Sequence, residues 1–328
     1  MKEFSYVRAT DAAQAVRLHA DRRGSRFLAG GTNLVDLMKI GVEQPIALID
    51  ISRAGLGTID ATPDGGMRIG ANVINSDLAA HSTIRRDFRA LSQAILAGAS
   101  GQLRNMATVG GNLMQRTRCA YFADTTLPCN KREPGSGCPA LPGEHHNHAI
   151  FDWSEHCVAT HPSDMAVALM ALDTTVEALA PDGPIQIPLE GFYSPVAATP
   201  HIETTLPENA LITGITIPSA KGVSRYRKVR ERASFAFASG SVAASLAVRG
   251  TQVHDVRIAL GGAAARPWRA SVAERALTGR PATTEEFRRA AAAELAEARP
   301  LPHNQYKIPL LRDLIVAVLD DLTAEATA

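Results

Sequence analysis

The chain has 328 residues, 45% of them hydrophobic and 20% charged, and its 34 basic and 33 acidic side chains leave a formal net charge of +1. This length can form two domains or a few more, and no apolar run is long enough to span a bilayer. The near-neutral charge argues against a nucleic-acid partner, which would be bound through an excess of Lys and Arg. We therefore expect a globular protein with no membrane span and no nucleic-acid partner.

The first predicted lobe, residues 1–55, contains a glycine-rich loop. Residues 26–41, RFLAGGTNLVDLMKIG, read as a short apolar strand, a glycine turn and an amphipathic helix. Gly30 and Gly31 permit positive φ and close approach of the main chain, and the N–H groups at the helix start can meet a phosphate. A tight strand-to-helix turn that binds nothing is the alternative. The lobe is expected to end in a strand at 45–51.

The second predicted lobe, residues 56–220, contains a mixed sheet and a loop of similar character. Residues 102–115, QLRNMATVGGNLMQ, place two glycines between small hydroxyl and amide side chains that can reach a phosphate or a ring. Neither loop matches the Rossmann or P-loop fingerprint, which disfavours both kinds of site. Two such loops together indicate a long cofactor. The candidate residues of the second loop are Thr108, Gly110, Gly111 and Asn112.

All cysteines of the chain lie in one segment of the second lobe, as Cys119, Cys129, Cys138 and Cys157. The segment around the first three is rich in Pro, Gly and basic residues and lacks clear periodicity, so these thiols are expected on an irregular loop. Four thiolates can hold a 4Fe-4S cluster, but the spacing matches neither the close pairs of zinc sites nor the tight run of bacterial ferredoxins. From the residues alone, a zinc site and two disulfides remain open as alternatives.

Other polar residues of the cysteine segment are interpreted as parts of a solvated loop. His145, His146 and His148 lie in GEHHNHA and are not expected to be ligands. Asp124 and Arg132 are expected only to make the loop soluble. Neither a Ser-His-Asp order nor an HExxH motif is present, so the sequence does not indicate a hydrolase.

Two ionisable residues after the cysteine segment have an ordinary interpretation and a functional one. Asp164, in THPSDMAVALMALD, precedes an apolar run and is typical of a helix cap. Lys228, in SRYRKVRERASFAFA, lies near Tyr226 in a β-like stretch, where a solvated surface charge is the ordinary interpretation. The residue types alone do not assign either one to a binding site.

The last predicted lobe, residues 221–328, begins with strands and ends with helices, which is an α+β order. Its tail also carries Lys307 ahead of the last apolar helix, in a region without a specific motif. Its strands are expected within 226–248 and 253–260, and its helices at 270–277, 284–298 and 310–322.

Four motifs, AGGTNL, TVGGNL, HPSD and YRKVRERASFAFA, occur in an order and at separations that resemble the FAD-binding medium subunit of the xanthine dehydrogenase and molybdenum hydroxylase family. The resemblance spans nearly the whole chain. It implies an α+β fold, with a two-lobed FAD-binding domain of the PCMH type followed by a C-terminal domain of the CO dehydrogenase flavoprotein type. Most members lack the cysteines. The insert at about 115–158 resembles that of the FAD-binding subunit of periplasmic aldehyde oxidoreductases, which carries a 4Fe-4S cluster.

The resemblance also implies roles for individual residues. The two glycine loops would surround the FAD pyrophosphate, and Asp164 would face the adenosine or ribitol side. Lys228 would lie near the isoalloxazine, where a cation stabilises negative charge on the reduced ring. The four cysteines would ligate the cluster. The implied FAD residues are Arg26, Phe27, Leu28, Ala29, Gly30, Gly31, Thr32, Asn33, Leu34, Thr108, Gly110, Gly111, Asn112, Asp164 and Lys228.

By the same resemblance, the chain is an electron-transfer subunit of a molybdenum-dependent aldehyde oxidoreductase. It would take electrons from 2Fe-2S clusters on a small partner subunit onto FAD and deliver them to an external acceptor. Aldehydes would be oxidised to carboxylic acids at the molybdenum cofactor of a large molybdopterin-binding subunit, in a heterotrimer, so no catalytic residue is assigned here. The alternatives are a self-sufficient flavin oxidase and a structural or assembly subunit whose cluster only pins a docking loop.

The start of the chain, MKEFSYVRATDAAQAV, shows no apolar core of a signal peptide. We therefore expect the protein to reach the periplasm only through co-export with a Tat-targeted partner, as the resemblance implies. Without such a partner, a cytoplasmic location is expected.

Overall fold

A small parallel sheet forms the first lobe of the computed structural model, which describes residues 1–326. Its strand order is β1–β3–β2, and a helix follows each of the first two strands because parallel neighbours need a crossover connection. The central strand is buried along its whole length and corresponds to the strand predicted at 45–51. The elements of this lobe are β1 (Ser5–Arg8), α1 (Ala12–Ala20), β2 (Ser25–Leu28), α2 (Leu34–Lys39) and β3 (Ala47–Asp50).

A five-stranded sheet in the order β4–β5–β8–β6–β7 organises the second lobe. Every neighbouring pair is antiparallel, so the prediction of a mixed sheet is wrong. Short connections join β4 to β5 and β6 to β7, and such connections suit antiparallel pairing without a crossover helix. The strands are β4 (Ile59–Ala61), β5 (Met67–Gly70), β6 (Thr175–Ala180), β7 (Gly183–Pro188) and β8 (Leu211–Ile217).

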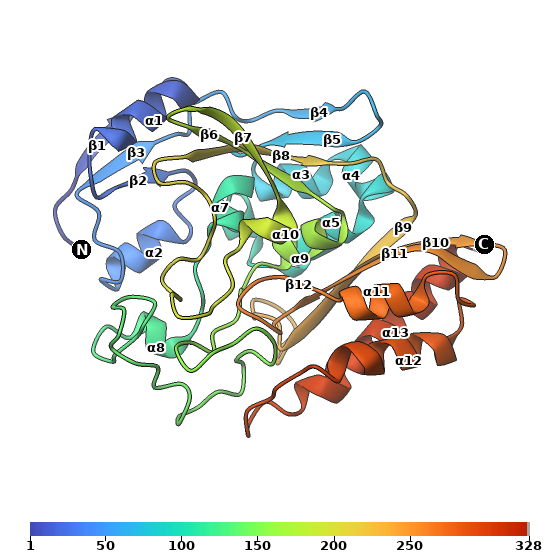
Figure 1. Cartoon of the computed structure of the whole chain (residues 1–328). Helices are drawn as coiled ribbons and strands as arrows, with labels where there is room; N and C mark the ends of the chain where they lie inside the picture. The colour runs from blue at the N-terminus through green and yellow to red at the C-terminus, as the bar shows by residue number, and fades with distance from the viewer. Residues whose placement is uncertain (327–328) are drawn as a thin grey trace.

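Helices lie below this second sheet in the view of Figure 1 and enclose the main apolar core. Ile69 and Ile215 of the sheet contribute to this core together with Leu91 and Leu169 of the helices, and all four side chains are buried. The helices of the lobe are α3 (Asn75–Ala80), α4 (Ser82–Asp87), α5 (Arg89–Ala97), α6 (Gly101–Arg104), α7 (Val109–Leu113), α8 (Ala120–Ala123), α9 (Asp164–Ala171) and α10 (Leu189–Phe192).

Helix α9 lies at the junction between the second and third lobes. All of its residues are buried, and all except Asp164 are apolar, as expected of a helix that is covered on every side. It packs against α5 of the second lobe and against β10 (Gly240–Arg249) and β11 (Gln252–Gly261) of the third. The beginning of α9, with Ser163 and Asp164, is therefore held between two lobes.

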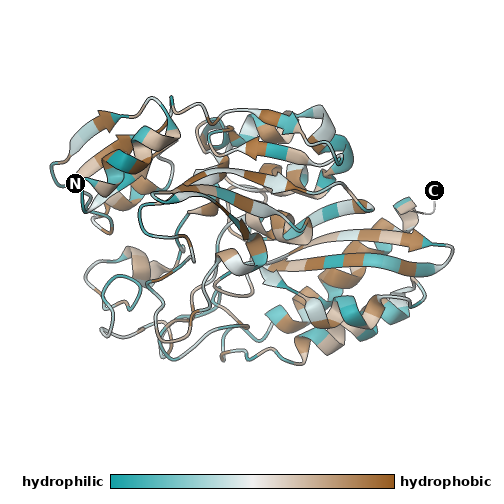
Figure 2. Ribbon diagram, turned by 45° about the horizontal axis from the view of Figure 1, so that its top comes forward, coloured by the Kyte–Doolittle hydropathy of each residue, from teal (hydrophilic) through white to brown (hydrophobic). Residues whose placement is uncertain are grey.

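The third lobe is an antiparallel sheet in the order β12–β11–β10–β9, with three helices packed against it (Figure 1). The stretch predicted at 226–248 comprises two strands, because a loop at 230–239 turns the chain back. Hydrophobic residues occur along the long strands β10 and β11 (Figure 2), and α13 packs against β10. The remaining elements are β9 (Val223–Val229), β12 (Trp268–Arg269), α11 (Ser271–Leu277), α12 (Thr284–Leu295) and α13 (Lys307–Ala326).

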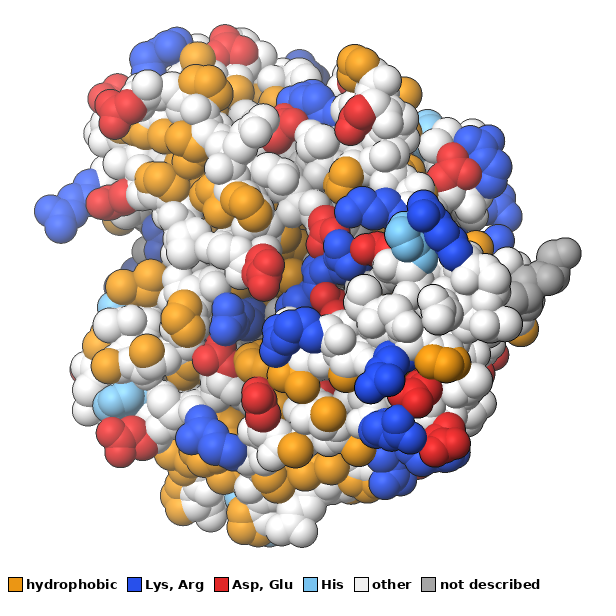
Figure 3. Space-filling model, turned by 45° about the vertical axis from the view of Figure 1, so that its right-hand side comes forward, with side chains coloured by type: hydrophobic (Ala, Val, Ile, Leu, Met, Phe, Trp, Pro, Cys, Tyr) orange, Lys and Arg blue, Asp and Glu red, His pale blue; other side chains and the backbone are white. Residues whose placement is uncertain are grey.

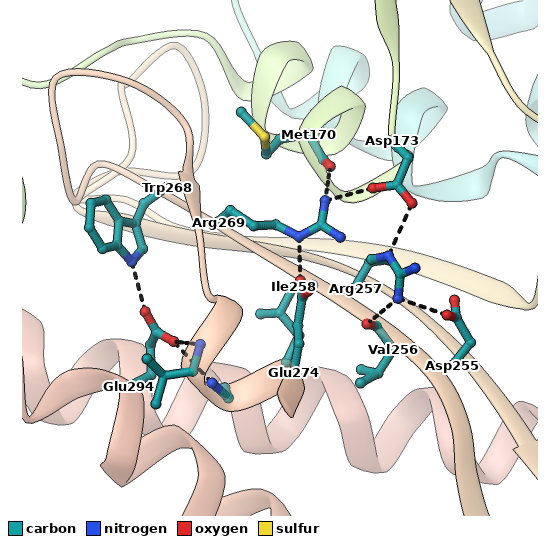
Figure 4. Close-up of polar contacts among 12 residues, drawn as sticks. Met170, Asp173, Asp255, Val256, Arg257, Ile258, Trp268, Arg269, Glu274 and Glu294 are labelled. Atoms are coloured by element: carbon teal, nitrogen blue, oxygen red, sulfur yellow. Dashed lines mark hydrogen bonds and ion pairs between the residues drawn. The ribbon is translucent and has the colours of Figure 1, made fainter. Parts of the chain in front are cut away.

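Two arginines tie the C-terminal end of α9 to the third sheet (Figure 4). Arg269 donates to the carbonyl oxygen of Met170 at 2.8 Å and to Asp173 Oδ1 at 2.8 Å. Arg257 donates from Nε to the other oxygen of Asp173 at 3.0 Å. Burial alone would raise the pKa of Asp173, but the two arginines outweigh it and hold this pKa below its usual value. The ionised carboxylate thus links two lobes.

The surface mixes side chains of both signs. On the face shown in Figure 3, basic and acidic groups are interspersed rather than gathered by sign, as nearly equal numbers of the two allow. Among residues 1–326, no helix combines the length and the hydropathy needed to cross a bilayer.

Candidate functional site

A cavity of about 820 Å³ opens where the first two lobes meet the cysteine segment. Both glycine loops predicted from the sequence line this cavity, and its volume lies in the range of small-molecule sites. Of the predicted residues, Leu28, Asn112, Asp164 and Lys228 lie outside the lining. Those that line the cavity are Arg26, Phe27, Ala29, Gly30, Gly31, Thr32, Asn33, Leu34, Thr108, Gly110 and Gly111.

The two glycine loops approach each other at Gly30. A Cβ at this position would lie 1.7 Å from the carbonyl oxygen of Met106, just before the second loop. Gly31 has a φ of +72°, which a residue with a side chain rarely adopts. In the second loop, Thr108 caps α7 by accepting from the N–H of Gly111 at 3.2 Å. The glycines therefore allow the two loops to pack closely together, and they also leave the backbone open to a ligand.

Three buried polar atoms beside the cavity have no partner among the described residues. They are Asn33 Nδ2, Asn72 Oδ1 and His161 Nε2, and all three residues line the cavity. The N–H of Ser163 donates to His161 Nδ1 at 3.3 Å, so the ring proton belongs on Nε2. Burial lowers the pKa of His161 to about 4, which keeps the ring neutral. Unpaired buried polar atoms are costly, so this arrangement fits a polar ligand.

A network of charged side chains crosses the wall of the cavity. Glu203 accepts from Arg116 Nε at 2.6 Å and from Lys131 Nζ at 2.8 Å, while Arg116 also pairs with Glu43 at 2.7 Å. Burial favours a raised pKa for Glu203, but Lys131 and Arg116 outweigh it and lower that pKa. Both cations are already paired with carboxylates. A phosphate bound here would therefore depend mainly on backbone N–H groups.

Asp164 and Lys228 form a buried ion pair with an N–O distance of 2.7 Å, and the two side chains are only 8% and 3% exposed. Tyr226 also donates to Asp164. Ser163 caps α9 by accepting from the N–H of Ala166, so the capping interpretation of Asp164 is wrong, as is the surface interpretation of Lys228. Burial raises the pKa of Asp164, and its partners offset only part of this effect.

A second cavity, of about 350 Å³, adjoins the first and contains Asp164 in its lining. Thr160 and His161 line both cavities, so these two residues mark the junction between them. Lys228 lines neither cavity and therefore lies one layer behind Asp164. The implied place of Lys228 near a flavin ring remains a prediction.

All four predicted cysteines line one small void on a segment with little regular structure. None of them is in a disulfide. Burial raises the pKa of Cys119 and Cys138, and raises the pKa of Cys157 to about 11. The N–H of Ala159 donates to Cys157 Sγ at 3.5 Å, and backbone N–H groups beside Cys119 and Cys138 offset part of the effect of burial on the pKa of these thiols. Within residues 1–326, no three His, Cys, Asp or Glu side chains form a site for a single metal ion.

The cysteine void and the large cavity share part of their lining. Thr117, Lys131 and Ala159 belong to both, so a group bound in the void would be one residue layer away from a ligand in the cavity. The sequence offered no signal for this arrangement. Arg116, Lys131 and Glu203 match no motif, and their partners lie far away in the chain.

The histidines of the cysteine segment are not a solvated stretch, and that prediction is wrong for two of them. His145 and His148 are 3% and 8% exposed, because the segment packs against the start of α13. Arg132 is also more than a solubilising charge, since it donates to the carbonyl oxygens of Tyr121 and Phe122 and so braces the loop. Asp124 accepts from Thr126 in a local turn.

Two family models account for almost the whole chain. Residues 2–220 match the model described as the FAD binding domain in molybdopterin dehydrogenase, and residues 224–322 match the CO dehydrogenase flavoprotein C-terminal domain. The resemblance found from the motifs and the predicted α+β fold are confirmed.

Curated relatives and solved structures agree with these matches. The chain is 50% identical to the aldehyde oxidoreductase FAD-binding subunit PaoB of Escherichia coli K12, across 99% of this chain and 100% of that protein. It is 26% identical to the glyceraldehyde dehydrogenase medium chain of Sulfolobus acidocaldarius, across 85% and 82%. A solved chain of carbon monoxide dehydrogenase from Hydrogenophaga pseudoflava superposes with a TM-score of 0.78 over 98% of both chains. At 24% identity, this last likeness shows the fold alone.

Proposed function

This chain belongs to the family of FAD-binding medium subunits of molybdenum hydroxylases, and on that premise we propose that it serves an aldehyde oxidoreductase. In this role it takes electrons from 2Fe-2S clusters of a partner onto FAD and passes them to an external acceptor. Aldehydes are oxidised to carboxylic acids on a different, molybdenum-containing subunit. The identity of 50% along the whole chain to an aldehyde oxidoreductase subunit supports this substrate class.

The observation that carries the proposal is the meeting of both glycine loops at one cavity with unpartnered polar atoms. Backbone N–H groups of the loops would hold the FAD pyrophosphate. Asn33 Nδ2 and His161 Nε2 would donate to the cofactor, and Asn72 Oδ1 would accept from it. FAD, when bound, supplies a carrier for two electrons. The protein's own contribution is to bind this carrier, orient it and separate it from bulk water.

The four cysteines support a second proposed group, a 4Fe-4S cluster. Thiolates are its usual ligands, and the backbone N–H groups around the sulfurs would stabilise their negative charge. The void measures about 10 Å³, which is close to the space of one water molecule, so the segment would have to open to admit a cluster. Its shared wall with the FAD cavity favours electron exchange between the two groups.

The proposed partners are a large molybdopterin-binding subunit and a small 2Fe-2S subunit, which with this chain form a heterotrimer. The names of relatives support this, since one is a carbon monoxide dehydrogenase medium chain and another a subunit of the 6-hydroxypseudooxynicotine dehydrogenase complex. We further propose a periplasmic location through co-export with a Tat-targeted partner, and a cytoplasmic one in its absence. Fractionation of cells with an intact or a deleted Tat pathway tests the location.

Expression of the chain alone and together with its two partners tests the function. Alone, the chain should bind FAD, be bleached by dithionite and be reoxidised by an acceptor dye, yet oxidise no aldehyde. In the complex, aldehyde turnover should reduce the same FAD. Aldehyde oxidation by the isolated chain at the rate of the complex would overturn the proposal in favour of a self-sufficient oxidase. If the chain did not retain FAD, the proposed electron-transfer function would be refuted.

A further inference from the structure

His148 approaches Cys119 from outside the void that the four cysteines line. Its Nε2 lies 3.2 Å from Cys119 Sγ, within hydrogen-bonding distance of sulfur. All four cysteines line the void, whereas His148 does not and instead lines the 350 Å³ cavity together with Cys119. The sulfur therefore has the void on one side and the imidazole on another. This placement suits a hydrogen-bond donor to the sulfur rather than a ligand inside the void.

The first turn of α13 and the residues just before it hold the backbone of His148. Lys307 Nζ donates to the carbonyl oxygen of His148 at 2.9 Å and to that of Gly262 at 2.6 Å. Asn304 Nδ2 donates to the carbonyl oxygens of His148 and Ala149 at 3.2 and 3.1 Å. Asn304 and Lys307 are both fully buried. The third lobe thereby fixes the position of a residue in the cysteine segment.

Two ring contacts strengthen the same connection. His145 stacks on His303 with a centroid distance of 4.4 Å, and His146 stacks on Tyr306 at 4.5 Å. His148 is therefore the end of a stretch, residues 145–148, that is held against the start of α13 at several points.

The partners of the imidazole indicate which nitrogen carries the proton. Nδ1 of His148 is buried and has no partner among the described residues. A neutral imidazole has a single N–H, and a cysteine sulfur that ligates a cluster is a thiolate, which can only accept a hydrogen bond. Placed on Nε2, the same N–H points to Cys119 Sγ, which accepts it as a thiolate. The hydrogen bond and the tautomer thus support each other.

We propose that His148 is a positioning residue that donates its Nε2–H to the sulfur of Cys119 and so raises the reduction potential of the cluster. The inference rests on the proposed 4Fe-4S cluster. Hydrogen bonds to cluster sulfurs offset the negative charge that the cluster gains on reduction, which favours the reduced state. Asn304 and Lys307 act through the backbone of His148, so the third lobe takes part in setting this potential.

Three variants of the holoprotein test the role of His148. His148→Phe removes the donor and keeps a planar ring, His148→Gln keeps a donor, and His146→Phe alters a neighbouring histidine that does not contact a cysteine. The measurements are iron and sulfide content and a redox titration followed by electron paramagnetic resonance. We expect all three to retain the cluster, and the Phe variant at 148 to disfavour reduction about tenfold, ~59 mV for a one-electron couple. The Gln variant should shift less, and the control should not shift.

Each outcome separates the inference from the proposed function. A wild type without iron after anaerobic purification would refute the cluster, and the inference with it. An unshifted potential in a loaded His148→Phe variant would refute the inference alone. Loss of iron from both variants at 148 would also overturn it, because His148 would then be a ligand. Loss of iron from the Phe variant alone would overturn it too, because the hydrogen bond would then be needed to hold the cluster rather than to set its potential.

Discussion

Gly30 lies directly against the carbonyl group of Met106, where a Cβ would stand 1.7 Å from the oxygen. This contact joins the first glycine loop to the chain entering the second, and both loops line the cavity proposed to bind FAD. Any side chain at Gly30 must therefore separate the two loops. The contact explains how motifs far apart in the sequence form one binding site.

The first prediction is that Gly30→Ala disrupts both the fold and FAD retention. Overpacking against a backbone carbonyl should cost about 3 kcal/mol or more, because no flexible side chain can move aside. Thermal unfolding and flavin content are the measurements. Gly101→Ala is the matched control, since a Cβ there meets nothing within 4 Å in a short helix. Full FAD occupancy and an unchanged melting temperature in Gly30→Ala would contradict the contact.

The glycine loops were predictable because their signal is local. A pair of glycines before the start of a helix can be recognised from a few consecutive residues. Most of the predicted loop residues line the cavity. The charged network around Glu203 was not predictable, because Arg116 lies 87 positions away in the chain and Lys131 lies 72 away. Only the folded chain brings such residues together.

Two local interpretations failed because neighbouring alternatives look alike in sequence. Ser163 and Asp164 are both good helix caps, and the structure uses the serine as the cap and leaves the aspartate free to pair with Lys228. The strand that carries Lys228 has the same pattern whether solvent or a helix covers its face. Helix α5 packs against that strand, so the lysine is buried.

The second prediction concerns the ion pair of Asp164 with Lys228. Lys228→Met should destabilise the protein by about 3–5 kcal/mol, because it leaves a buried carboxylate without its counter-ion. The effect on the flavin potential should be small, since the raised pKa of Asp164 lets this group take up a proton instead. The double variant Asp164→Asn/Lys228→Met should recover much of the loss in denaturant unfolding. A double variant less stable than Lys228→Met would contradict the pairing.

The third prediction is a loss of stability in acid that depends on Glu203. The folded pKa of Glu203 lies below its unfolded value, so its contribution is fully present above the unfolded pKa of about 4.3. The contribution is lost as pH falls through the lower, folded pKa. Glu203→Gln should therefore flatten the acid limb of the unfolding free energy measured between pH 3 and 7. An acid limb as steep as that of wild type would assign the acid sensitivity to other carboxylates.

The fourth prediction tests the link between α9 and the third sheet (Figure 4). Arg269→Gln removes the charge-assisted hydrogen bonds to Asp173 and Glu274, and should cost about 2–4 kcal/mol because the arginine side chain is only 13% exposed. Arg289→Gln is the control, because this side chain is 60% exposed in its pairs with Glu285 and Glu286. Its loss should cost less than about 1 kcal/mol. Equal losses in the two variants would show that Arg269 is an ordinary surface charge.

The last prediction separates the cysteine site from the FAD site. Cys129→Ser should remove about one cluster per chain, because a hydroxyl is a poor ligand for iron compared with a thiolate. FAD should stay bound, since Cys129 does not line the cavity and the shared wall of Thr117, Lys131 and Ala159 is left intact. Iron, sulfide and flavin are quantified in the anaerobically purified protein. Zinc in the wild type would show that the cysteines form a zinc site instead of a cluster. A free-thiol assay that shows two disulfides would likewise contradict the cluster. Loss of FAD along with iron would show instead that the cysteine segment must be loaded before the cavity can form.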